Sequence, residues 1–104
     1  MSTFDQREDS FEKRYVHDEE LRFKAEARRN KLVGLWAAGI LGKTGDDAKA
    51  YAASVVAEDI KEHGEEDVAR KLITDLGPLS DEVTIRSKMA ELMREAKAQL
   101  VSEA

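Results

Sequence analysis

The fold of this chain is decided by the stretch Leu32-Val33-Gly34-Leu35-Trp36-Ala37-Ala38-Gly39-Ile40-Leu41. The stretch carries no charge, and a helix built from it would be apolar on nearly every side. Such a helix is typical of one that other helices surround, so we expect it at the centre of a helical bundle. It falls well short of the roughly 20 apolar residues that span a bilayer, so we expect no membrane insertion.

Apolar residues at helical spacing predict one helix around this stretch and three after it. The first should run from about Asp18 to Leu41, with one face formed by Leu21, Ala25, Arg28, Leu32, Leu35, Trp36, Gly39 and Ile40. The buried stripes predicted for the other three are Ala48, Tyr51, Ala52, Val55, Val56 and Ile60; Val68, Ala69, Leu72, Ile73 and Leu76; and Ile85, Met89, Leu92, Met93, Ala96 and Leu100. The expected fold is therefore all-α, with residues 18–104 as a four-helix bundle.

Capping residues separate the predicted helices. Thr44 is placed to cap the second helix, and Gly64 to end it. Gly77-Pro78 stops the third, because proline cannot continue a helix. Ser80 is expected to cap the fourth helix, with acidic residues following in its first turn.

Composition excludes several classes of function. The chain has 104 residues, enough for one small domain, and a net charge of -5, which argues against nucleic acid as the main partner. It has no cysteine, so a disulfide scaffold, a thiolate metal site and a cysteine nucleophile are excluded together. The first residues are charged where a signal peptide would be apolar, and we expect a soluble, intracellular protein.

Residues 1–17 differ from the rest of the chain. Phe4, Phe11 and Tyr15 stand among many charges, at a spacing that would align them on one face of a helix. The segment has too little apolar surface to fold alone, yet it would be amphipathic if helical. It is therefore either an arm that folds onto a partner or an extension whose aromatic rings dock on the chain's own bundle.

One motif suggests nucleotide binding. The segment Ala37-Ala38-Gly39-Ile40-Leu41-Gly42-Lys43-Thr44 fits a relaxed phosphate-binding loop with alanine in the first glycine position. Such a loop follows a strand, whereas here a long helix precedes it, so a helix-ending Gly42 and a turn are the favoured interpretation. Weak contact of ADP or ATP with Gly42, Lys43, Thr44 and Gly45 stays open, but catalysis there is not expected.

No other pattern indicates an enzyme, a cofactor or a metal. The two histidines, His17 and His63, lie far apart, and the acidic pairs at predicted helix starts are explained by the helix dipole. The one basic cluster, Arg28-Arg29-Asn30-Lys31, is interpreted as the solvated flank of a helix rather than a nucleic-acid patch. A third interpretation is that this cluster binds an anionic protein partner.

Several strings resemble the ζ-subunit family of alphaproteobacterial F1-ATPase inhibitors. They are Phe4-Asp5-Gln6-Arg7-Glu8-Asp9-Ser10-Phe11-Glu12, His17-Asp18-Glu19, Phe23-Lys24-Ala25-Glu26-Ala27-Arg28-Arg29-Asn30-Lys31-Leu32, Gly34-Leu35-Trp36-Ala37-Ala38 and Leu41-Gly42. The resemblance covers essentially the whole chain and is densest from Phe4 to Gly42. Members of this family are described as four-helix bundles whose N-terminal arm is inhibitory.

The resemblance implies a partner and a mechanism. It implies that residues 1–17 enter a catalytic αβ interface of F1 near the γ shaft and block ATP hydrolysis, in the cytoplasm at the inner membrane. The expected apolar anchors are Phe4, Phe11 and Tyr15, and the expected polar contacts are Asp5, Arg7, Glu8 and Glu12. Two alternatives are a small regulator that senses adenine nucleotide at Gly42–Gly45 and a generic adaptor whose arm docks on another assembly.

Overall fold

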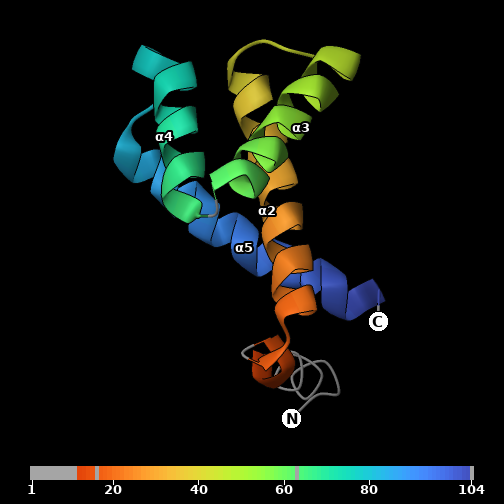
Figure 1. Ribbon diagram of the computed structural model, residues 1–104. Coiled ribbons are helices and arrows are strands. Elements are labelled where there is room, and N and C mark those ends of the chain that lie inside the picture. Colours follow the sequence, from red (N-terminus) through yellow and green to blue (C-terminus); the bar gives the residue numbers. More distant parts are fainter. Residues whose placement is uncertain (1–11, 16, 63, 104) are drawn as a thin grey trace.

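The computed structural model describes residues 12–15, 17–62 and 64–103, apart from the side chains of residues 60–62. Within this part the chain is helical and contains no strand, which confirms the all-α class. The helices are α2 (Glu19–Ile40), α3 (Gly45–Glu62), α4 (Glu65–Leu76), the short 3-10 helix η1 (Gly77–Leu79) and α5 (Glu82–Glu103) (Figure 1). Residues 12–15 are helical too. None of the described helices is both long and apolar enough to cross a membrane.

The four long helices contact one another in cyclic order. α2 packs against α3, α3 against α4, α4 against α5, and α5 against α2, while α2 also reaches α4. Figure 1 shows α2 beside α3, with α5 crossing behind α2 and α4 standing over one end of α5. α2 therefore touches every other long helix, as its uncharged stretch predicts.

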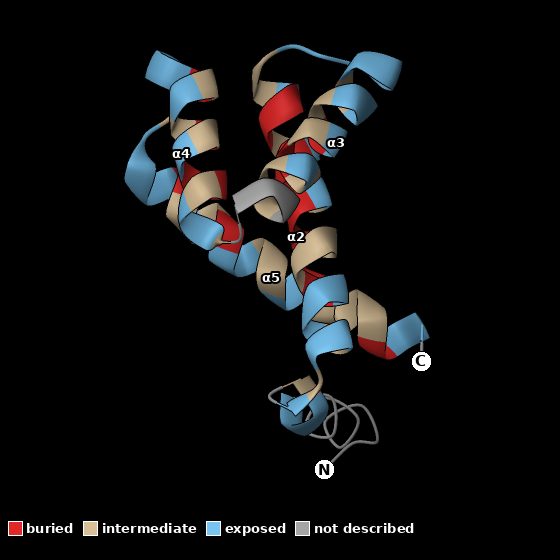
Figure 2. Cartoon of the chain, viewed as in Figure 1, coloured by how far each residue is buried: buried red, intermediate tan, exposed pale blue. Residues whose placement is uncertain are grey.

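The core forms where these helices meet. Figure 2 shows the buried positions gathered on the facing sides of the helices. The buried residues of the main cluster are Val33, Ala37, Val55, Val68, Ala69, Leu72, Leu76, Ile85 and Met89. The stripes predicted for α3, α4 and α5 supply all of these except Val33 and Ala37, so the helical spacing located three of the four buried faces.

The predicted face of α2 is only partly correct: Ala25 is buried, and Trp36 and Ile40 pack against the main cluster. Its buried residues are Ala25, Arg29, Asn30, Val33, Gly34, Ala37 and Ala38, whereas Leu35 is 37% exposed. The reason is the approach of α3: a Cβ atom placed on Gly34 would lie 2.7 Å from the Cα atom of Ala52. Such close contact requires the small residues of α2 to face α3, and this turns Leu35 outward.

Local capping sets the two ends of α2. The Leu21 amide donates a 3.1 Å hydrogen bond to the Asp18 carboxylate, which makes Asp18 the N-cap. At the other end Gly42 adopts a φ of 78°, which favours glycine. Its amide donates to the Gly39 carbonyl at 3.1 Å, and the Lys43 amide donates to the Ala38 carbonyl at 2.9 Å. These two bonds form the Schellman motif and confirm Gly42 as a helix-ending residue.

The predicted cap of the last helix is displaced by one residue. The Thr84 amide donates a 2.8 Å hydrogen bond to the Asp81 carboxylate, so Asp81 rather than Ser80 caps α5. Ser80 is extended, with φ -154° and ψ -178°, because it leaves η1 before the turn of α5 begins. The hydrogen bond from Thr84 lowers the pKa of Asp81 below its usual range.

Candidate functional site

The C-terminal end of the predicted arm, residues 12–15, which we call the base of the arm, contacts α5. The Lys97 ammonium lies 3.6 Å from a carboxylate oxygen of Glu12 and 4.1 Å from the centre of the Tyr15 ring. Tyr15 is half-buried, and this burial, together with the Glu26 carboxylate, raises the pKa of its phenol. Lys97 was not a candidate in the sequence, because its partners lie at the other end of the chain.

The structure thus brings together two of the seven predicted arm residues, Glu12 and Tyr15. The other predicted contacts lie outside the described residues: Phe4, Asp5, Arg7, Glu8 and Phe11. Their placement therefore stays a prediction.

A groove of about 770 Å³ opens beside the base of the arm. It is lined by Arg14, Leu21, Phe23, Lys24, Ala27, Arg28, Lys31, Val56, Leu100 and Glu103. The Glu103 carboxylate accepts two hydrogen bonds from the Arg28 guanidinium, which lowers the pKa of that carboxyl. Four of the lining residues are cationic and one is anionic, so the groove combines positive charge with apolar surface.

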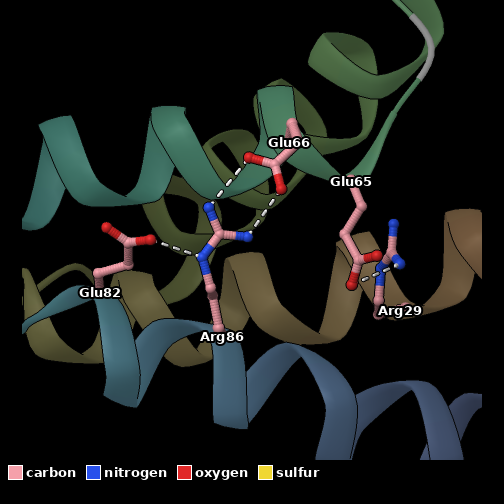
Figure 3. Close-up of polar contacts among 5 residues, drawn as sticks. All are labelled: Arg29, Glu65, Glu66, Glu82 and Arg86. Atoms are coloured by element: carbon pink, nitrogen blue, oxygen red, sulfur yellow. Dashed lines mark hydrogen bonds and ion pairs between the residues drawn. The ribbon is translucent and has the colours of Figure 1, made fainter.

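The basic cluster of α2 does not behave as a solvated flank throughout. Arg29 is only 4% exposed; its Nε donates a 3.0 Å hydrogen bond to the Asn30 side-chain oxygen, and its guanidinium lies 3.8 Å from Glu65 (Figure 3). Asn30 is fully buried, and its Nδ2 finds no hydrogen-bond partner among the described atoms. Arg28 is half-buried against α5, and Lys31 is exposed. The two middle residues of the cluster are therefore structural.

A second ion-pair cluster joins α4 to α5. Both terminal nitrogens of Arg86 donate to Glu66 at 3.0 Å, and its Nε donates to Glu82 at 2.8 Å (Figure 3). Glu66 stands in the first turn of α4, where an acidic residue was expected to offset the helix dipole. The hydrogen bonds from Arg86, and its charge, lower the pKa of Glu66. Together with the Arg29–Glu65 pair, these ion pairs connect α4 to both α2 and α5.

The turn between α2 and α3 holds the last four residues of the relaxed phosphate-binding motif, and Gly45 begins α3. Gly42, Lys43, Thr44 and Gly45 are all exposed. The amides of Gly42 and Lys43 already donate to α2 carbonyls, so they are not free to bind phosphate. The weak nucleotide contact stays a prediction. Among the residues that the structure describes, no group of three or more histidine and acidic side chains could hold a metal ion.

Comparisons with known proteins identify the family of the chain and a related solved structure. The family model described as ATPase inhibitor subunit zeta matches residues 1–99. A structure determined by solution NMR is 56% identical in sequence and superposes with a TM-score of 0.74, over 81% of this chain and 99% of that chain. No curated protein matches at a significant level. Because the family model spans nearly the whole sequence, this chain belongs to the ATPase inhibitor subunit zeta family.

Proposed function

We propose that this chain inhibits ATP hydrolysis by the F1 sector of ATP synthase and has no catalysis of its own. Residues 1–17 insert as a helix at a catalytic αβ interface near the γ subunit. Residues 18–104 form a four-helix bundle that carries this arm, in the cytoplasm at the inner membrane. The observation that carries the proposal is the family match, which begins at residue 1 and so includes the whole arm.

The local structure at the end of the arm supports a helical mode of insertion. Residues 12–15 are already helical, so the chain adopts this conformation where the arm joins the bundle. Continued toward the N-terminus, the same helix would place Phe4, Phe11 and Tyr15 on one face. Aromatic side chains and arginine supply most of the binding energy at protein interfaces, and Arg7 lies in the same segment.

The first test measures steady-state ATP hydrolysis by an alphaproteobacterial F1 titrated with the full chain or with a chain lacking residues 1–17. We expect saturable inhibition by the full chain alone, with the helical circular dichroism of the shortened chain retained. Equal inhibition by both chains would reject the arm as the inhibitory element. No inhibition by either would reject the proposed partner.

Single substitutions in the full chain separate the arm from the rest of the surface. Phe4→Ala and Phe11→Ala should each weaken inhibition by about thirtyfold, since truncating an interface anchor costs on the order of 2 kcal/mol. Leu79→Ala is the control, because Leu79 is 58% exposed on η1 and lies outside both the arm and the groove beside it. A loss of the same size in Leu79→Ala, with none in the other two variants, would move the interface to η1.

A further inference from the structure

Lys97 holds two side chains that belong to the predicted inhibitory arm. Its ammonium meets the Glu12 carboxylate at 3.6 Å and the face of the Tyr15 ring at 4.1 Å. The Lys97 side chain is 22% exposed, so both contacts are partly shielded from water. One cation therefore fixes the base of the arm to α5 through a charge pair and a cation–π contact.

We propose that Lys97 is an autoinhibitory latch, which holds the arm against α5 and must be released before the arm can engage its target. The inference rests on the proposed function and adds a regulation of the same arm. Glu12 and Tyr15 cannot lie on Lys97 and contact F1 with the same carboxylate and the same ring face. Binding to F1 therefore competes with the contact that the free chain makes to itself.

The competition lowers the apparent affinity of the free chain. When only the released fraction can bind, the apparent dissociation constant rises in inverse proportion to that fraction. Taken together, a partly exposed charge pair and a cation–π contact correspond to roughly a threefold to thirtyfold effect on the released fraction. Removing the charge of Lys97 should strengthen inhibition by that factor.

Two variants of Lys97 separate the effect of its charge from that of its aliphatic stem. Lys97→Met keeps most of the aliphatic stem and removes the ammonium, whereas Lys97→Arg keeps a cation. Lys88→Met is the matched control on the same helix. The Lys88 side chain is 29% exposed, pairs with Glu91 at 2.7 Å and lies 5.9 Å from the Trp36 ring centre, all within the bundle.

Two measurements on the full chain test the Lys97 latch and the inhibition of F1 separately. NMR order parameters of the backbone amides in residues 12–15 report the latch in the absence of F1; rigid backbone gives values near 0.85 and flexible backbone values below about 0.6. Titration of F1-catalysed ATP hydrolysis reports the consequence. We expect Lys97→Met to lower the order parameters and to inhibit about threefold to thirtyfold more tightly. Lys97→Arg and Lys88→Met should behave like the parent chain.

Each contrary result has a distinct meaning. Unchanged order parameters in Lys97→Met would show that Lys97 does not hold the arm and would overturn the latch. Lower order parameters with unchanged or weaker inhibition would overturn the autoinhibitory role, because release of the arm from Lys97 would then not strengthen inhibition. Absence of inhibition by every protein, including the parent chain, would overturn the proposed function and the autoinhibitory role with it, while the order parameters would still decide whether the contact exists.

Discussion

The contact between α2 and α3 can be tested with two glycines of the same helix. A Cβ atom on Gly34 would lie 2.7 Å from the Ala52 Cα atom, 3.1 Å from its Cβ atom and 3.3 Å from a methyl group of Val55. A Cβ atom on Gly39 would meet nothing within 4 Å. Gly34→Ala and Gly39→Ala therefore add the same methyl group to one helix, in a crowded position and in an open one.

The expected magnitudes follow from this difference. Alanine is favoured over glycine within a helix by roughly 0.5–1 kcal/mol, and Gly39→Ala should gain about that much stability. Gly34→Ala has the same gain in helix propensity, but its methyl group would overlap the backbone of Ala52. Overpacking of this kind costs about 1–3 kcal/mol. Since the gain is common to both, the two variants should differ in free energy of unfolding by about 1–3 kcal/mol.

The assay is urea and thermal unfolding followed by far-ultraviolet circular dichroism. For a chain of 104 residues, a difference of about 2 kcal/mol separates the melting temperatures by roughly 8–16 °C, with Gly39→Ala the more stable. If Gly34→Ala is as stable as Gly39→Ala, α3 does not approach α2 closely, and our explanation for the buried face of α2 is refuted.

Three further substitutions each remove a single polar contact. Asp18→Ala removes the N-cap of α2 and should lower the free energy of unfolding in urea by about 1 kcal/mol, whereas Asp18→Asn should retain most of it. Tyr51→Phe removes a 2.8 Å hydrogen bond to Asp75 and should lower the free energy of unfolding by about 0.5–1.5 kcal/mol. Burial and Asp75 raise the pKa of Tyr51 above 10.0, so the parent chain should lose stability as the pH rises above 10. The variant should lose less stability over the same pH range. Glu66→Gln should lower the melting temperature at pH 7 but not in acid: Arg86 holds the pKa of Glu66 below 4.5, so this contribution is complete above that pH and is lost as the pH falls through the lowered pKa. An equal effect of Glu66→Gln at both pH values would contradict the ion pair.

Helix ends were the most predictable part of the fold. Asp18 and Gly42 act through hydrogen bonds to residues within a few positions in sequence, so their role is visible without any tertiary contact. Ser80 and Asp81 show the limit of this reasoning. Both residue types can cap a helix, and the choice depends on where η1 ends and α5 begins.

The buried face of α2 could not be predicted in the same way. Periodicity locates a face only when polar residues mark the opposite side, and Leu32–Leu41 has none. The close approach of α3 to Gly34 then decided the rotation of α2 and turned Leu35 outward. The same rotation buried Arg29 and Asn30, which as charged and polar residues were expected at the surface.

The same distinction between local and tertiary contacts applies to the candidate site. The sequence by itself determined the helical class, most helix ends and the amphipathic character of residues 1–17, because these depend on spacing and on neighbours along the chain. Only the tertiary structure decided that α2 shows its small residues to α3, and that Lys97 meets Glu12 and Tyr15. Those contacts join residues far apart in sequence, and their packing and charge energies exist only once the helices have come together.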